Sequence, residues 1–269
     1  MFSFFKRTKA APTAPTTEGR LIYAIGDVHG RIDALEVLLR TIVQDARATA
    51  PAARPLLIFL GDYVDRGPAS KEVVSLIIAL GKEASLEVRA LKGNHEEALL
   101  QFLDEPEFGS TWAEYGGITT LASYGVTPPT GRTDPEAWAV ASQALAKAMP
   151  RDHLAFYNEL ELMAVVGDYA FVHAGVRPGV SLAHQSAHDL MWIRQEFLSS
   201  PGRFEKIIVH GHTPMEEPQM TKARIGVDTG VYATGILTAV RLDDRGATFL
   251  QAKVGYAPAT NPVAATQAA

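Results

Sequence analysis

The chain has 269 residues, of which 47% are hydrophobic and 20% are charged, an ordinary composition for a globular protein that can fill a sizeable core. Its formal net charge of -5 argues against a protein that binds nucleic acid through a broad basic surface. The absence of cysteine excludes disulfides and thiolate metal sites, so a metal would need His, Asp, Asn or Glu ligands, and it fits the cytoplasmic location that we expect.

Both ends of the chain are expected to be disordered. Residues 1–19 start with a short Phe-rich cluster and continue into an Ala-, Pro- and Thr-rich leader, and residues 257–269 have a similar composition. The start lacks the long apolar segment of an export signal, and no run approaches the roughly 20 apolar residues needed to cross a bilayer. We therefore expect one folded domain over residues 20–256 and no stable membrane insertion.

Three short apolar runs in the first part of the chain each end in a polar loop. They cover residues 21–25, 56–60 and 86–91, and each of the first two is followed by Gly-Asp. Apolar residues recur at helical spacing between the runs, and residues 96–103 are expected to form a further helix. This alternation predicts an α/β fold in which the ends of the strands carry the functional side chains.

Residues 104–160 interrupt the alternation and are expected to form an inserted cap. They contain an aromatic segment at 112–124, a Pro- and Gly-rich stretch, and a predicted helix over 134–148. From residue 161 onward, β signals dominate. Six strands are predicted there, at residues 162–166, 169–172, 206–209, 224–227, 235–242 and 247–253.

Five polar clusters follow apolar runs. They combine glycine, which permits tight turns, with Asp, His or Asn, which suit Mn²⁺, Fe, Zn²⁺ or Co²⁺. One cluster alone would indicate a turn or a helix cap, but five in order favour a site for two metals that share a carboxylate. The clusters are Gly26–Gly30 (GDVHG), Gly61–Gly67 (GDYVDRG), Gly93–Glu96 (GNHE), His173–Gly175 (HAG) and Gly211–Thr213 (GHT).

These motifs resemble those of metallophosphoesterases of the phosphoprotein phosphatase (PPP) superfamily, which includes bacterial and phage serine/threonine phosphatases and symmetrical diadenosine tetraphosphatases. The resemblance runs from about Ile22 to Asp228. It implies a calcineurin-like fold, which is a two-sheet β-sandwich flanked by helices, here with a helical cap insertion. It also implies two divalent metal ions, with Mn²⁺ as the first expectation and Fe, Zn²⁺ or Co²⁺ as alternatives.

The resemblance also implies a set of metal ligands. Asp27 and His29 would hold one metal, Asp62 would bridge both, and Asn94, His173 and His212 would hold the second. Asn94 is counted among the residues that contact the phosphate as well.

Beside the ligands, the resemblance implies an acid and a phosphate clamp. His95 would protonate the leaving alkoxide, with Asp65 orienting its imidazole. Arg66 would bind the phosphate, because a guanidinium can donate two parallel hydrogen bonds to its oxygens. The family uses a second arginine, for which we prefer Arg194 and keep Arg177 as the alternative.

Two further acidic residues have two interpretations each. Glu96 either forms hydrogen bonds to the backbone or to a ligand beside the metals, or complements the dipole at a helix N-terminus. Asp228 either orients His212 or His29 or is an ordinary turn residue.

The leading hypothesis is a phosphatase that acts on phosphoserine and phosphothreonine in proteins, with phosphotyrosine as a further substrate. The reaction would be an in-line attack by a metal-bridging hydroxide. The first alternative is a dinucleoside polyphosphate hydrolase, because residues 112–117 and 119–125 resemble the tetraphosphatase branch. Trp112, Tyr115 and Tyr124 could then stack on a nucleobase, although aromatic residues at this spacing are more often core. A silent binding module and a metal-dependent nuclease are further alternatives, which the complete ligand set and the acidic charge disfavour.

Overall fold

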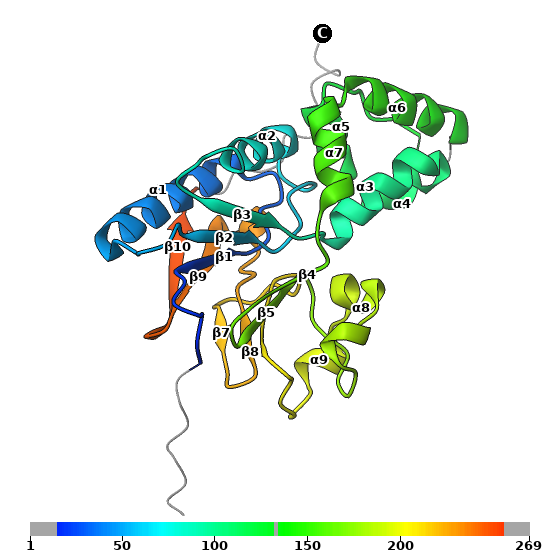
Figure 1. Ribbon diagram of the computed structural model, residues 1–269. Coiled ribbons are helices and arrows are strands. Elements are labelled where there is room, and N and C mark those ends of the chain that lie inside the picture. Colours follow the sequence, from blue (N-terminus) through cyan, green and yellow to red (C-terminus); the bar gives the residue numbers. More distant parts are fainter. Residues whose placement is uncertain (1–14, 132–133, 256–269) are drawn as a thin grey trace, which may run out of the picture.

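The computed structural model describes residues 15–131 and 134–255 (Figure 1). Within these residues, one five-stranded sheet has the order β10-β9-β1-β2-β3. Strands β1, β2 and β3 are parallel, whereas β9 runs antiparallel to β1 and β10 antiparallel to β9. Its strands are β1 (Ile22–Ile25), β2 (Leu56–Phe59), β3 (Glu87–Ala90), β9 (Ile236–Asp243) and β10 (Gly246–Lys253).

The second sheet has the order β4-β5-β6-β8-β7. Strands β5, β6 and β8 are parallel, and β4 and β7 run antiparallel at the two edges. Its strands are β4 (Met163–Val166), β5 (Tyr169–Val172), β6 (Ile207–His210), β7 (Gln219–Met220) and β8 (Arg224–Gly226). The two mixed sheets and their flanking helices confirm the predicted fold class.

The core between the sheets is built from alternate residues of the strands, because successive side chains of a strand point to opposite faces. Ile22 of β1 packs with Phe171 of β5 and Val209 of β6 in this layer. The next residue, Tyr23, belongs instead to the layer that β1 forms with the first helix. The apolar runs are therefore continuous because their strands are covered on both faces.

Helices cover the outer faces of both sheets (Figure 1). Those on the first sheet are α1 (Ile32–Thr49) and α2 (Ser70–Leu80). Those on the second are α8 (Ala187–Trp192) and α9 (Gln195–Leu198), through Leu190 and Phe197. Short elements complete this part: η2 (Leu182–His184) and α10 (Val231–Thr234). No helix within the two described ranges is long and apolar enough to cross a membrane.

Residues 104–160, which we call the cap, are mainly helical and are drawn in green in Figure 1. Asp134 begins the predicted helix, because its Oδ1 accepts a hydrogen bond from the backbone N–H of Ala137 at 3.1 Å. Inside the cap, Trp112 stacks on Phe102 with ring centroids 4.8 Å apart. The helices at and within the cap are α3 (Asn94–Asp104), η1 (Pro106–Phe108), α4 (Gly109–Glu114), α5 (Gly117–Ser123), α6 (Pro135–Ala148) and α7 (Arg151–Glu159).

Order begins before Arg20, which is earlier than the sequence pattern indicates. Thr17, assigned above to the leader, is fully buried, and its backbone N–H donates to Asp244 at 2.7 Å. The backbone N–H of Thr16 donates to Asp168 at 2.9 Å. These partners lie far away in the sequence, so no local pattern reveals them. Residues 1–14 and 257–269, predicted to be disordered, lie outside the described residues.

Candidate active site

The predicted metal ligands converge where strands of both sheets end. Asp27 follows β1, Asp62 follows β2, Asn94 follows β3, His173 follows β5 and His212 follows β6. All five side chains are buried. Because the carboxyl ends of parallel strands meet at one edge of a sheet, the two sheets together bring these side chains into one site.

The backbone of the site adopts conformations that side chains normally avoid. Among the described non-glycine residues, φ is positive at seven positions, five of which are predicted site residues. Such conformations cost on the order of 1–3 kcal/mol each and persist only where the surrounding structure imposes them. The five residues are His29 (φ 44°), Asp62 (φ 53°), Asp65 (φ 70°), Arg66 (φ 68°) and His212 (φ 64°).

The turn that carries Asp62 is held by the buried carboxylate of Glu96. One oxygen of Glu96 accepts from the backbone N–H groups of Asp62 (2.9 Å) and Gly93 (3.0 Å), and the other accepts from Tyr63 (2.8 Å). Burial and the charge of Asp62 raise the pKa of Glu96 to about 7, against the effect of these donors. The contacts favour the first of the two interpretations of Glu96, because the carboxylate joins the turn after β2 to the start of α3.

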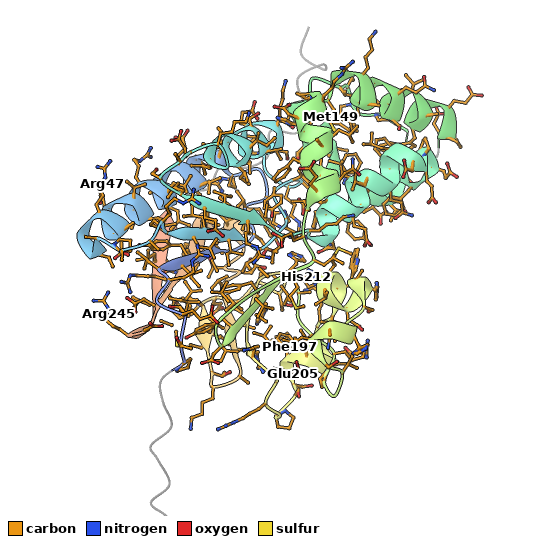
Figure 2. All side chains as sticks on the ribbon, in the orientation of Figure 1. Arg47, Met149, Phe197, Glu205, His212 and Arg245 are labelled. Carbon is orange, nitrogen blue, oxygen red and sulfur yellow. The ribbon has the colours of Figure 1, made fainter. Side chains whose placement is uncertain are left out.

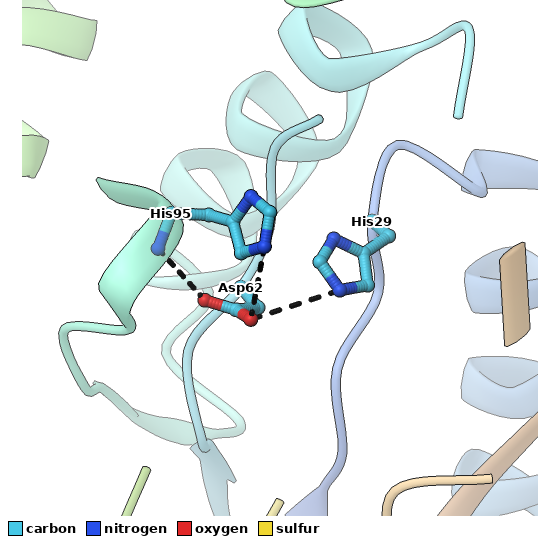
Figure 3. A group of neighbouring side chains, drawn as sticks. All are labelled: His29, Asp62 and His95. Atoms are coloured by element: carbon cyan, nitrogen blue, oxygen red, sulfur yellow. Dashed lines mark hydrogen bonds and ion pairs between the residues drawn. The ribbon is translucent and has the colours of Figure 1, made fainter. Parts of the chain in front are cut away.

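One group of donor atoms surrounds Asp62 on the side of β1 (Figure 3). His29, Asp62 and His95 each offer one atom, and these atoms lie within 4.8 Å of one another. The Oδ2 atom of Asp62 lies 3.6 Å from Nε2 of His29 and 3.8 Å from Nε2 of His95. Asp62 and His29 are thus adjacent, as predicted, and His95 lies close enough to face the same position.

A second group lies on the other side of Asp62. Asp62, His173 and His212 again offer atoms within 4.8 Å of one another. Nε2 of His173 lies 3.4 Å from Oδ1 of Asp62, 3.0 Å from Oδ1 of Asn94 and 3.2 Å from Nδ1 of His212. Figure 2 shows His212 between the cap helices and α8. Asp62 belongs to both groups, which is the arrangement expected of a bridging ligand.

The histidine rings present lone pairs rather than protons to these positions. Nδ1 of His29 faces the carbonyl of Val64 at 2.9 Å, and Nδ1 of His173 faces the carbonyl of Leu60 at 2.9 Å. Because a carbonyl only accepts, each Nδ1 carries the proton and each Nε2 has a free lone pair. The atoms that could donate a lone pair to a metal are thus hydrogen-bond acceptors that face one another around Asp62. A cation between them would satisfy them all.

Burial keeps these rings neutral, which is the form that binds metals. It lowers the pKa of His29 well below its usual value, and it also lowers the pKa of His173. Burial, with His173 beside it, lowers the pKa of His212 to about 2. Nε2 of His212 is buried and has no hydrogen-bond partner among the described residues. This Nε2 is not the nitrogen that faces His173, which is Nδ1. The acceptors that face one another around Asp62 show that the residues fit a pair of divalent cations.

Asp27 lies beside the donor groups rather than within them. Both of its carboxylate oxygens lie 3.1 Å from the backbone N–H of His212. Burial, together with the charges of Asp228 and Asp62, raises the pKa of Asp27 well above its usual value. Asp228 accepts from the backbone N–H of Gly230 at 2.8 Å, as a turn aspartate does, and burial raises its pKa to about 6. A nearby cation would relieve this concentration of negative charge.

His95 and Asp65 form the predicted pair. Nδ1 of His95 lies 2.7 Å from Oδ2 of Asp65, and both side chains are buried. Burial lowers the pKa of His95, but the carboxylates of Asp62 and Asp65 outweigh it and raise the pKa above its usual value. With Nδ1 held by Asp65, Nε2 is the ring nitrogen that lies on the side of Asp62 and Arg66.

Arg66 lies beside this pair. One guanidinium nitrogen is 3.3 Å from Nε2 of His95, and the guanidinium carbon lies 4.3 Å from the ring centre of Tyr232. Tyr232, which the sequence analysis did not single out, also packs edge-on against His29 at 5.3 Å. Its position just after the Asp228 turn is the signal that could have found it.

The two candidates for the second arginine have different surroundings. Arg194 donates to the carbonyl of His212 at 3.2 Å, which places it beside the second donor group. Arg177 is engaged with Asp189 through two hydrogen bonds, at 2.9 and 2.5 Å. Arg194, the preferred residue, therefore lies at the site, whereas the guanidinium of Arg177 is held in an ion pair with Asp189.

The aromatic residues of the segment at 112–124 divide into core and surface. Trp112 and Tyr124 are buried and so unavailable for stacking on a base, whereas Tyr115 is 39% exposed. The ring of Tyr115 lies 6.3 Å from that of His95 and 6.4 Å from that of Trp192. Among the three candidates for base stacking, the site therefore presents Tyr115.

Comparison with known proteins places the chain in a family. The sequence model of the calcineurin-like phosphoesterases matches residues 20–234. An asymmetrical bis(5'-nucleosyl)-tetraphosphatase, PrpE of Geobacillus thermodenitrificans, is 25% identical over 254 residues, covering 87% of this chain and 95% of the relative. A symmetrical bis(5'-nucleosyl)-tetraphosphatase of Acidovorax sp. (strain JS42) is 30% identical over 192 residues, which are 70% of this chain and 51% of that protein.

Comparison of structures agrees with this placement. A crystal structure assigned to a diadenosine tetraphosphatase superposes with a TM-score of 0.61 at 19% identity, covering 90% of this chain and all of the other. Its likeness concerns the fold alone. Together with the family match, which spans all five motifs, it leads to one conclusion: the chain belongs to the calcineurin-like phosphoesterases.

Proposed function

We propose that this protein is a phosphatase that cleaves phosphomonoesters with poor leaving groups, with phosphoserine and phosphothreonine in proteins as its main substrates and phosphotyrosine as a further one. The observation that carries the proposal is the buried pair of His95 and Asp65, 2.7 Å apart. An alkoxide is a strong base and leaves slowly unless it is protonated, so a positioned acid accelerates this cleavage by about 10²–10⁴-fold.

The donor groups define the cofactor that we propose, which is a pair of divalent cations with Mn²⁺ as the first candidate. Such cations supply a nucleophilic water at neutral pH and neutralise charge on the phosphate. The residues that would hold them are Asp27, His29, Asp62, Asn94, His173 and His212.

The remaining residues of the site would act on the phosphate and the leaving group. As the water oxygen bonds to phosphorus, the bond from phosphorus to the leaving oxygen breaks, and Nε2 of His95 passes its proton to that oxygen. Asp65 holds the ring and stabilises its charged form. Arg66 and Arg194, with Asn94, would bind the phosphate oxygens that gain negative charge.

A second candidate substrate is a dinucleoside tetraphosphate. It is favoured by the activity named for the two relatives and by the exposed ring of Tyr115 beside His95, on which a base could stack. The leaving group would then be a nucleotide phosphate, which is a much weaker base than an alkoxide. Cleavage of such a substrate would depend less on His95, and this difference separates the two candidates.

The test compares a phosphoserine peptide, a phosphotyrosine peptide and diadenosine tetraphosphate at matched concentrations with Mn²⁺. We expect the peptides to be the better substrates, and we expect His95→Asn to lower kcat on phosphoserine by about 10²–10⁴-fold. His184→Asn is the control, because this histidine is exposed. Preference for the dinucleotide by orders of magnitude would overturn the choice of substrate and support the second candidate.

A further inference from the structure

The cap enters the active site through two buried polar side chains, Trp112 of α4 and Thr120 of α5. We propose that these two are positioning residues for the general acid: they fix the carboxylate of Asp65, which in turn fixes the imidazole of His95. The inference rests on the proposed function, because it assumes that His95 acts as the acid. It assigns to the cap a part in catalysis.

Among the described residues, the Asp65 carboxylate accepts hydrogen bonds from three side chains. Oδ2 accepts from Nδ1 of His95 at 2.7 Å and from Nε1 of Trp112 at 2.9 Å. Oδ1 accepts from the hydroxyl of Thr120 at 2.6 Å. Asp65 is fully buried, so no bulk water replaces a donor that is lost. Two of its three side-chain donors therefore come from the cap.

The direction of the Thr120 hydrogen bond is fixed by its other neighbours. The backbone N–H of Asp65 donates to the Thr120 hydroxyl oxygen at 2.9 Å. The hydroxyl of Ser70 lies 3.0 Å from the same oxygen and 3.1 Å from that backbone nitrogen. A carboxylate oxygen only accepts, so the Thr120 hydroxyl donates its single proton to Asp65, while its own oxygen accepts from the backbone N–H of Asp65. Hydrogen bonds therefore run both from the cap to the Asp65 loop and from that loop to the cap.

Packing leaves the indole of Trp112 little freedom. Trp112 is fully buried and stacks on Phe102 with an angle of 30° between the rings. Gly117 also lies against the indole, with which a Cβ added at this glycine would collide. The Nε1–H group is thus held toward Asp65 by the cap itself, and hydrogen bonds to a charged acceptor are the strong ones. Any loosening of this contact should reach His95.

The test uses two substrates that differ in their need for an acid. Phenyl phosphate has a strongly basic leaving group, whereas 2,4-dinitrophenyl phosphate has a weakly basic one that leaves without a proton. We expect Trp112→Phe and Thr120→Val each to lower the ratio of the two kcat values, phenyl over dinitrophenyl, by about tenfold. Thr120→Ser, which keeps the hydroxyl, should restore the ratio. The matched control is Trp138→Phe, another buried tryptophan of the cap, whose ring packs against Phe102.

An equal loss on both substrates would overturn the inference, because a role in folding or metal binding lowers both rates together. A second readout does not depend on turnover. The Nδ1 proton of His95, identified by its loss in His95→Asn, should give a downfield NMR resonance. We expect Trp112→Phe and Thr120→Val to shift this resonance and Trp138→Phe to leave it in place. If the wild-type protein cleaves no phosphomonoester, the proposed function fails. If the resonance stays in place in Trp112→Phe and Thr120→Val, the positioning role fails, whatever the turnover.

Discussion

Replacing Glu96 by Gln tests what holds the bridging carboxylate in place. The buried carboxylate of Glu96 accepts from four backbone N–H groups, those of Asp62, Tyr63, Val64 and Gly93, at 2.8 to 3.3 Å. A glutamine keeps one of the two oxygens and replaces the other by an NH₂ group, which cannot accept from the two N–H groups that donated to that oxygen. At least two hydrogen bonds are lost, and the donors left without an acceptor are buried beside Glu96 and Asp62.

The size of the effect follows from these contacts. A buried donor left without an acceptor costs about 1–3 kcal/mol, so the loss of two hydrogen bonds predicts a decrease of about 2–6 kcal/mol in the free energy of unfolding. Asp62 has a left-handed backbone that only its surroundings maintain. We therefore expect the turn to relax in Glu96→Gln and the affinity for Mn²⁺ to fall as well.

The assay is urea unfolding followed by circular dichroism, with and without Mn²⁺, together with a Mn²⁺ titration. The matched control is Glu97→Gln, because Glu97 lies in the same first turn of α3 and its carboxylate accepts from Trp192. The helix dipole alone accounts for about 0.3–1 kcal/mol at either position. Small and equal effects of the two substitutions, with unchanged Mn²⁺ affinity, would refute the reasoning and leave Glu96 as a dipole-complementing residue.

Three further predictions concern the arginines, a glycine and a remote histidine. In steady-state kinetics, Arg194→Ala should raise KM for a phosphopeptide about tenfold, and Arg177→Ala should leave KM unchanged. The reverse result would identify Arg177 as the second arginine that binds the phosphate. Gly93→Ala should abolish Mn²⁺ binding by titration, because the added Cβ would collide with Asp62, and normal affinity would count against the rigidity of that turn. Burial lowers the pKa of His153, so the unfolded chain takes up a proton more readily and stability is lost as the pH falls below about 6.5. His153→Gln should therefore reduce the drop in Tm between about pH 7 and pH 5, and an undiminished drop would place the acid sensitivity elsewhere.

Much of the fold could be predicted because the strands and their polar ends lie close together in the sequence. The run at 56–60 is apolar at every position and is followed by Gly-Asp, and the structure places β2 over Leu56–Phe59. The helix predicted at 134–148 begins with a capping aspartate and forms as α6 (Pro135–Ala148). In contrast, β7 (Gln219–Met220) has two exposed residues and no pattern of its own, so only its pairing with β8 defines it.

The site could be predicted only as far as its motifs extend. His29, Asp62 and His212 stand in recognisable clusters, but their left-handed backbones run against local preference and are imposed by tertiary contacts. Trp112 had two interpretations, base stacking or the more common core position, and its burial favours the second. Its hydrogen bond to Asp65, 47 residues earlier, could not be foreseen, because spacing along the chain does not reveal which distant side chains meet.

The central claim is that Asp62 stands between two divalent cations. Anomalous diffraction at the manganese edge, from crystals grown with Mn²⁺, tests it directly. We predict two peaks on opposite sides of the Asp62 carboxylate, one beside His29 and the other beside His173 and His212. A single peak, or peaks that do not flank Asp62, would contradict the account.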